Sequence, residues 1–131
     1  MVDQTGKTAW ITGASSGIGE ALAKAFVAGG GSAVLSGRNV TELERVATES
    51  GAPDRCLILP FDTMDFAALP DKVAAAIAFR DGIDVLVNNA GISQRSLAID
   101  TDFSVYDRII GVDLLAPIAL TQALLPHLLA C

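Results

Sequence analysis

The chain has 131 residues, of which 51% are hydrophobic, and a mean hydropathy of +0.47. This composition excludes an intrinsically disordered chain, and the length predicts one domain spanning residues 1–131. Fifteen acidic against nine basic residues give a net charge of −6, so neither nucleic acid nor an anionic membrane surface is expected as a partner.

Cysteine usage and apolar segments bear on the compartment. The two cysteines, Cys56 and Cys131, form no disulfide framework, which favours a reducing compartment, and neither stands in a pattern typical of a catalytic thiol. The N-terminal residues hold no secretory signal, and the most apolar stretch, 114–131, is interrupted by polar residues and two prolines. We therefore expect a soluble, cytoplasmic protein with no transmembrane helix.

Strand-like and helix-like patterns alternate along the chain. Short, continuous apolar runs predict buried strands at residues 8–12, 33–36, 56–59 and 83–87. Apolar residues at spacings of three and four predict helices at residues 17–28, 41–50, 70–80 and 105–129. The glycines at 29–31 end the first helix, and Pro117 is expected to kink the last one.

Capping signals support two of these helices. Thr41 with Glu44 forms a capping-box pattern at the start of the second helix, and Ser104 is expected to cap the last. Continuous apolar strands between amphipathic helices are typical of an α/β domain in which helices cover both faces of a parallel sheet.

A glycine-rich segment, residues 12–19 (TGASSGIG), separates the first strand from the first helix. Gly13 allows a sharp turn off the strand, Gly17 lets the backbone approach a pyrophosphate, and Gly19 permits close packing of helix on strand. The helix N-terminus and the serine hydroxyls favour phosphate. Glycine-rich turns also occur as plain tight loops, but a position between a strand and a helix favours dinucleotide binding.

Three motifs give the chain a resemblance to a known family, the short-chain dehydrogenase/reductases. They are the glycine pattern of residues 12–19, Asp62 after the third strand, and residues 88–91 (NNAG) after the fourth. The resemblance implies a Rossmann-type three-layer α/β/α fold with strand order 3-2-1-4. It also implies hydride transfer between a nicotinamide cofactor and a carbonyl or secondary alcohol. It covers only the first half of the family's fold, so we expect a truncated domain that lacks the C-terminal strands.

A finer resemblance is to the family's branch of dehydrogenase/reductase member 7-like proteins. It is carried by the segment Ser93-Gln94-Arg95-Ser96-Leu97 together with residues 100–101 and 120–121.

The end of the second strand bears on the choice between NAD and NADP. Gly37 stands where NAD-preferring members of the family carry Asp, and Arg38 follows it. An acidic side chain there would repel a 2′-phosphate, whereas a guanidinium pairs well with phosphate. We predict a preference for NADP(H). The alternative is that Arg38 is a solvated residue before a helix.

Further cofactor contacts are implied by the resemblance. Asp62 would accept the adenine amino group and Thr63 would contribute its backbone, although Asp62 could instead be a helix cap. Asn88 and Asn89 would brace the sheet while residues 90–91 line the cofactor. The expected cofactor-binding residues are Gly13, Ser15, Ser16, Gly17, Ile18, Gly19, Arg38, Asn39, Asp62, Thr63, Asn89, Ala90, Gly91 and Val112.

The family's catalytic acid is a Tyr whose pKa is lowered by a Lys four residues later, assisted by an upstream Ser. This chain has one tyrosine, Tyr106, with Ile110 four residues on, and its lysines all precede it. Tyr106 is therefore expected to pack on the fold as a helix residue. Asp113 falls at the family's catalytic Asn, where its charge would alter a proton relay; alternatively, it is an Asp tolerated before Pro117.

The remaining signals are structural. His127 has no partner at metal-ligand spacing, so no metal site is expected, and Trp10 is predicted to be core. The helix at residues 112–129 is apolar on most faces, and the fourth strand would leave an edge unpaired, which together predict a homo-oligomer.

Two classes of function remain open. The first is the NADP-binding portion of an oxidoreductase that acts on a small-molecule carbonyl or alcohol once completed, the chain alone being inactive. The second is a non-catalytic NADP-binding or sensory module, or a truncated remnant without the catalytic Ser, Tyr and Lys.

Overall fold

The computed structural model describes residues 2–93 and 95–130. Gln94, part of the segment that resembles the member 7-like branch, and Cys131 lie outside the described residues. One parallel sheet of four strands runs in the order β3-β2-β1-β4, which confirms the predicted order. The strands are β1 (Thr8–Thr12), β2 (Ser32–Ser36), β3 (Cys56–Ile58) and β4 (Val85–Val87).

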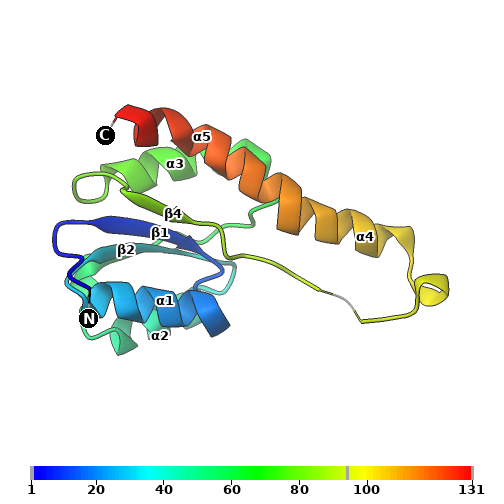
Figure 1. Cartoon of the computed structure of the whole chain (residues 1–131), viewed down its shortest axis with the longest axis horizontal. Helices are drawn as coiled ribbons and strands as arrows, with labels where there is room; N and C mark the ends of the chain where they lie inside the picture. The colour runs from blue at the N-terminus through cyan, green and yellow to red at the C-terminus, as the bar shows by residue number, and fades with distance from the viewer. Residues whose placement is uncertain (1, 94, 131) are drawn as a thin grey trace.

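Helices cover both faces of this sheet, as the resemblance implied (Figure 1). One face carries α1 (Gly17–Ala28) and α2 (Val40–Glu49). The other carries α3 (Leu69–Ala78) and α5 (Ala116–Ala130). Three short 3₁₀ helices that the sequence did not predict are η1 (Pro53–Arg55), η2 (Phe66–Ala68) and η3 (Ala98–Asp100).

The central strands are buried on both faces, which explains their unbroken apolar runs. Ile11 and Leu35 belong to the core under α1 and α2, whereas Trp10 and Val34 belong to the core under α3 and α5. Successive side chains of a strand point to opposite faces, so neighbouring residues divide between the two cores. The indole N–H of Trp10, which is fully buried, donates to the hydroxyl of Ser36 over 2.8 Å.

Two helices begin at caps other than those predicted. The side chain of Asn39 accepts a hydrogen bond from the N–H of Glu42 at 3.2 Å, so α2 starts before Thr41. Asp102 accepts from the N–H of Ser104 at 2.8 Å and caps α4 (Phe103–Ile110). Asn39 and Asp102 keep the extended backbone that a cap requires, whereas Thr41 and Ser104 already lie in the helices.

The last helix is continuous through its prolines. A π-helical segment, η4 (Gly111–Leu115), joins α4 to α5. It occupies the turn before Pro117, where the proline ring crowds the carbonyl of residue 113 and removes an N–H. The combined helix, Phe103–Ala130, is long and apolar enough to cross a membrane, by length and composition only. Its apolar 18-residue segment has a mean hydropathy of 1.7, and 28% of that segment is buried inside the protein.

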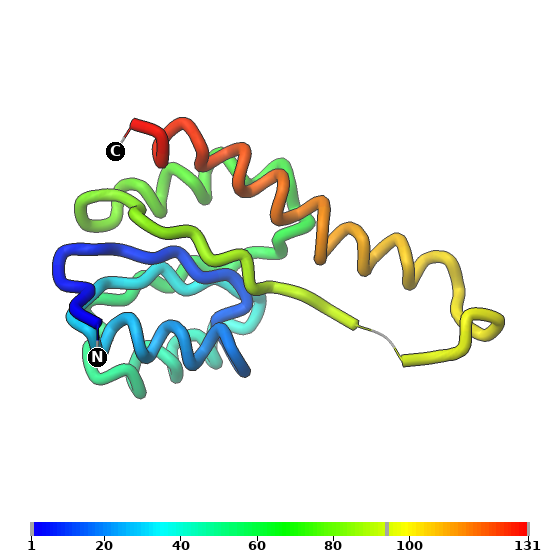
Figure 2. Tube along the Cα trace, in the orientation of Figure 1, coloured from blue at the N-terminus to red at the C-terminus, as the bar shows by residue number. Residues whose placement is uncertain are grey.

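Only the second part of this helix packs on the sheet. Leu120 and Leu124 of α5 are buried in the core, whereas α4 has no buried residue. Figure 2 shows α4 and the chain before it extending beyond the sheet. Tyr106 lies on α4 with 44% of its surface exposed. The prediction that Tyr106 is a helix residue is confirmed, but it is not packed into the core, because α4 extends beyond the sheet.

Cys56 stands at the start of β3 and is partly buried. Its Sγ lies 3.7 Å from the carbonyl of Ala52 and 3.8 Å from the hydroxyl of Ser50. Burial raises the pKa of the thiol above its ordinary value, which disfavours the reactive thiolate.

Candidate cofactor-binding site

An open cavity of about 290 Å³ lies at the carboxyl ends of the strands. The chain passes from β1 to β2 on one side of the sheet and returns to β4 on the other, so β1 and β4 flank the point where the strand order reverses. Open α/β sheets bind ligands at such a point. The predicted residues that line the cavity are Gly13, Ser15, Ser16, Arg38, Asp62, Thr63, Asn89, Ala90, Gly91 and Val112.

Four predicted residues do not line this cavity: Gly17, Ile18, Gly19 and Asn39. A Cβ at Gly19 would lie 2.1 Å from the carbonyl oxygen of Gly13, so the predicted close packing of helix on strand is confirmed. Gly17 has a φ of +56° and nothing within 4 Å of a Cβ position, which leaves open space over the loop. Asn39 uses its side chain to cap α2.

The phosphate loop is tied to the loop after β4 through buried Thr12. Its hydroxyl accepts hydrogen bonds from the backbone N–H groups of Asn89 and Ala90, both at 3.0 Å. The side-chain amide of Asn89 donates to the carbonyl of Gly13 at 3.1 Å, and that of Asn88 donates to Thr121 at 3.0 Å. Both asparagines therefore brace the fold as expected. Thr12 was predicted only as the first residue of the glycine-rich segment, and its anchoring role was missed. The signal for that role is a hydroxyl at the end of a buried strand.

The start of α1 has polar groups available for an anion. Ser16 is the cap residue of α1, yet its side chain makes no capping hydrogen bond. Within residues 2–93 and 95–130, the hydroxyls of Ser15 and Ser16 make no hydrogen bond. A helix N-terminus with free amides and nearby hydroxyls suits a phosphate group. The residues present thus fit the pyrophosphate of a dinucleotide.

Arg38 and Gly37 line the cavity beyond the end of β2. Arg38 is exposed and forms no hydrogen bond or ion pair with any described residue. Gly37 brings no charge to this end of the cavity. A free guanidinium beside a position without a carboxylate suits a phosphate on the ribose.

Asp62 closes a local turn rather than capping a helix. Its Oδ1 accepts from the N–H of Met64 at 2.9 Å, and the segment after it leads into η2 before α3 begins. Asp62 and Thr63 share the cavity with Arg108 of α4, which the sequence analysis missed. Arg108 stands four residues before Val112 on the same helix, and that spacing is the signal that could have found it. The other residues missed are Phe61 and Ile92, whereas Gly37, singled out for the choice between NAD and NADP, does line the cavity.

Asp113 and His127 both bind backbone. Asp113, in η4, accepts from the N–H of Ile92 at 2.8 Å and does not line the cavity. Nε2 of His127 accepts from the N–H of Ile83 at 3.0 Å, which joins α5 to the segment just before β4. Within the described part of the chain, no group of three His, Cys, Asp or Glu side chains could hold a metal ion.

Comparison with known proteins finds relatives that match nearly the whole length of the chain. Residues 7–130 match the model of the short chain dehydrogenase family. The chain is 43% identical to human "Dehydrogenase/reductase SDR family member 7" over 95% of its own length and 38% of that protein. It is also 43% identical to the Anopheles gambiae "Dehydrogenase/reductase SDR family protein 7-like", over 95% of this chain and 41% of the relative.

Solved structures show the same fold. A short-chain dehydrogenase/reductase (glucose/ribitol dehydrogenase) from Brucella melitensis matches with a TM-score of 0.90 and 31% identity, over 96% of this chain and 54% of that one. A 3-ketoacyl-(acyl-carrier-protein) reductase from the same organism, complexed with NADH, matches with a TM-score of 0.88 and 39% identity, over 95% and 51% of the two chains. The chain thus spans about two-fifths of the curated relatives and half of these structures. With a family model matched from residue 7 to residue 130, the chain belongs to the short chain dehydrogenase family.

Proposed function

We propose that the chain is the NADP(H)-binding portion of an oxidoreductase that transfers a hydride between nicotinamide and a carbonyl or secondary alcohol. The observation that carries this proposal is the cavity at the reversal of strand order, which is lined by the phosphate loop at one end and by uncommitted Arg38 at another. When bound, the nicotinamide cofactor supplies or accepts the hydride. The role of the described residues is to bind and orient it.

The residues divide along the cofactor. Ser15, Ser16 and the start of α1 hold the pyrophosphate, and Arg38 pairs with the 2′-phosphate. Asp62 and Thr63 meet the adenine. Residues 89–91 follow β4, on the other side of the point where the strand order reverses. They line the part of the cavity in which the nicotinamide would lie.

The NADP preference can be tested directly. A charge-assisted hydrogen bond contributes roughly 1.5–3 kcal/mol, which corresponds to about a 10- to 150-fold preference for NADPH over NADH. Titration of the purified chain with each nucleotide, followed by nucleotide fluorescence, measures both dissociation constants. Equal constants would refute the preference, and a tighter constant for NADH would reverse it.

A second candidate is a non-catalytic NADP-binding or sensory module, or a truncated remnant. One observation favours this class. Tyr106, the chain's single tyrosine, lies on exposed α4 and has Ile110 rather than Lys four residues later. General acid–base catalysis contributes about 10²- to 10⁴-fold, so we propose that the chain by itself is inactive. NADPH oxidation with a panel of aldehydes and ketones, at saturating nucleotide, separates binding from turnover.

We further propose a cytoplasmic homo-oligomer. Tyr106, Ile110, Leu114 and Ile118 follow one another at four-residue spacing and are each 44–50% exposed, so they form an apolar stripe along one side of the long helix. Contiguous exposed apolar surface of this kind favours association. The part of the helix after this stripe packs on the sheet through Leu124, which supports a folded domain in water.

A further inference from the structure

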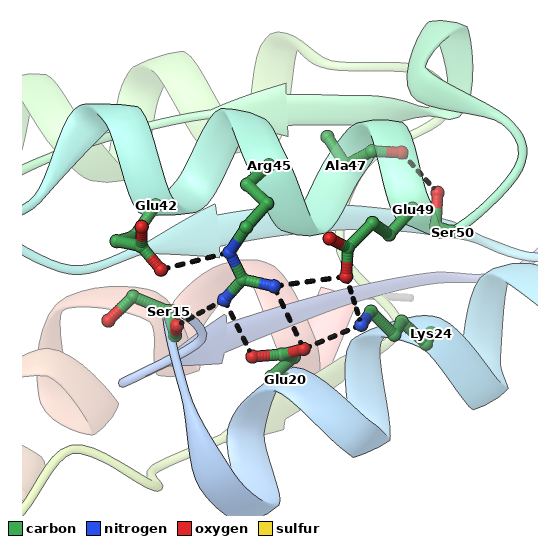
Figure 3. Close-up of polar contacts among 8 residues, drawn as sticks. All are labelled: Ser15, Glu20, Lys24, Glu42, Arg45, Ala47, Glu49 and Ser50. Carbon is green, nitrogen blue, oxygen red and sulfur yellow. Dashed lines mark hydrogen bonds and ion pairs between the residues drawn. The ribbon is translucent and has the colours of Figure 1, made fainter.

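Arg45 of α2 connects two helices with the phosphate loop (Figure 3). Its guanidinium bonds to Glu42 at 2.9 Å and to Glu49 at 3.0 Å on its own helix. Across the interface it bonds to Glu20 of α1 at 2.9 Å. Both Nη1 and Nη2 donate to Glu20, and Nη2 also donates to the backbone carbonyl of Ser15 at 3.2 Å.

This last bond has no substitute in the loop. Of the hydrogen bonds formed by residues 2–93 and 95–130, the one from Arg45 is the only one that Ser15 makes. The residues on either side are held by backbone: the N–H of Ala14 donates to Ser36 at 3.1 Å, and the carbonyl of Ser16 accepts from Glu20 at 3.2 Å. The orientation of the peptide unit between Ser15 and Ser16 therefore depends on a side chain from a different helix.

The charges around Arg45 show that its guanidinium is already paired and is not available to bind a phosphate. Three carboxylates surround its guanidinium, and the hydrogen bonds that it donates, first to Glu20 and then to Glu42, raise its pKa. Glu20 is held in turn by Arg45 and by Lys24, whose Nζ lies 2.5 Å from it, and its pKa is lowered to about 2. Exposed ion pairs contribute little stability one at a time. The pair with Glu20 has a positional effect, because it ties the guanidinium to α1 beside the phosphate loop.

We propose that Arg45 is a positioning residue for the phosphate loop. By holding the Ser15 carbonyl and anchoring to α1 through Glu20, it fixes the direction of the loop amides that face the pyrophosphate. It touches neither cofactor nor substrate; Arg45 does not line the cavity. This inference rests on the proposed NADP(H)-binding function, and it adds a residue that acts on affinity from outside the cavity.

The experiment compares two ligands of the full 131-residue chain. NADPH spans the phosphate loop, whereas adenosine 2′-monophosphate carries the adenine and the 2′-phosphate but no pyrophosphate. We expect Arg45→Met to weaken NADPH binding about tenfold, the value of one charge-assisted hydrogen bond. Adenosine 2′-monophosphate should bind with an affinity within about twofold of the wild type. A merely structural role would weaken both ligands alike.

Two double variants are the controls. Glu42→Gln with Glu49→Gln weakens the pairs within α2 and the pair of Glu49 with Lys24, but leaves the bonds from Arg45 to Ser15 and Glu20. NADPH affinity should therefore be retained. Glu20→Gln combined with Arg45→Met removes the carboxylate that Arg45 neutralised. Its NADPH affinity should stay as low as that of Arg45→Met; recovery to the wild-type value would overturn the proposal, because relief of charge and not position would then be the role of Arg45.

Hydrogen exchange of the free chain gives a readout that does not depend on ligand. Amides of residues 14–18 should exchange faster in Arg45→Met, with no change in the strands; unchanged exchange would overturn the proposal. If Arg45→Met does not fold, Arg45→Lys serves instead, because its single ammonium keeps the charge but cannot span Glu20 and Ser15 in the same way. If the wild-type chain binds neither NADPH nor NADH, the proposed function fails, and exchange alone decides the role of Arg45.

Discussion

The carboxylate of Asp113 accepts a hydrogen bond from the backbone N–H of Ile92, with an N···O distance of 2.8 Å. This bond joins the π-helical turn of the long helix to the loop that follows β4. The same oxygen would lie 3.3 Å from a Cβ at Gly91, which lines the cavity. Asp113 therefore supports one wall of the site from behind, and its side chain is used there as an acceptor.

An acceptor role predicts that charge is dispensable at this position. Asp113→Asn keeps an oxygen that can accept from Ile92, so NADPH affinity should stay within about twofold of the wild type. Asp113→Ala leaves that N–H without its partner, and affinity should fall by about fivefold, with faster exchange of the amides in residues 89–93. If Asp113→Asn behaves like Asp113→Ala, the charge itself is required.

Removal of Arg38 should change nucleotide preference rather than overall binding. Arg38→Ala is expected to weaken NADPH about 10- to 150-fold, through loss of a bond to the 2′-phosphate, while NADH affinity stays constant. Arg95→Ala is the matched control, because Arg95 is also exposed and lies outside the cavity lining. Parallel titrations with both nucleotides give the ratio. Loss of both affinities together would contradict the assignment of Arg38 to the 2′-phosphate.

Loss of the Thr12 hydroxyl should lower both the free energy of unfolding and the affinity for NADPH. Thr12→Val keeps the shape of this buried side chain but leaves the N–H of Ala90 without an acceptor and that of Asn89 with only the carbonyl of Val87, at 3.1 Å. An unsatisfied buried group costs about 1–3 kcal/mol, and the N–H of Ala90 is only partly buried, so the free energy of unfolding in urea should fall by up to that amount. NADPH affinity should fall as well. Thr12→Ser keeps the hydroxyl and should recover most of both quantities; a Ser variant as weak as Val would mean that the methyl group, not the hydroxyl, matters.

The Glu20 network predicts a specific acid response. The hydrogen bonds from Arg45 and Lys24 lower the pKa of Glu20 to about 2 in the folded chain, from its ordinary value of 4.5. Because the folded-state pKa is the lower one, the stabilising contribution of Glu20 is complete above pH 4.5 and is lost as the pH falls toward 2. Thermal unfolding between pH 7 and pH 2.5 should show a steeper loss of Tm in this window for the wild type than for Glu20→Gln. Parallel curves for the two proteins would contradict the pairing.

The apolar stripe on the long helix predicts association in solution. Leu114→Glu places a charge in the centre of the stripe and should shift the chain toward monomer in multi-angle light scattering. Val2→Glu is the control, because Val2 is 73% exposed and lies in the N-terminal segment. A wild-type chain that is already monomeric and melts cooperatively would contradict the proposed oligomer.

Local sequence patterns were sufficient to predict the four strands, the longer helices and most of the residues that line the cavity. Three features could be predicted because each depends on residues adjacent in the chain. They are the apolar runs of the strands, the glycines of residues 12–19 and the position of Arg38. Helix starts were harder to place. Asn39 and Thr41 are both good cap residues, and only the backbone conformation decided between them.

The amino-acid sequence by itself determined the α/β alternation, the phosphate loop and the absence of a Tyr-x-x-x-Lys pattern around Tyr106. Only the tertiary structure decided that Phe61 and Ile92 line the same cavity as Arg38, and that Arg45 binds the carbonyl of Ser15. The physical reason is that a parallel sheet brings the ends of distant strands and their helices to one edge. The hydrogen bonds made there depend on the packing of elements, and no local spacing encodes them.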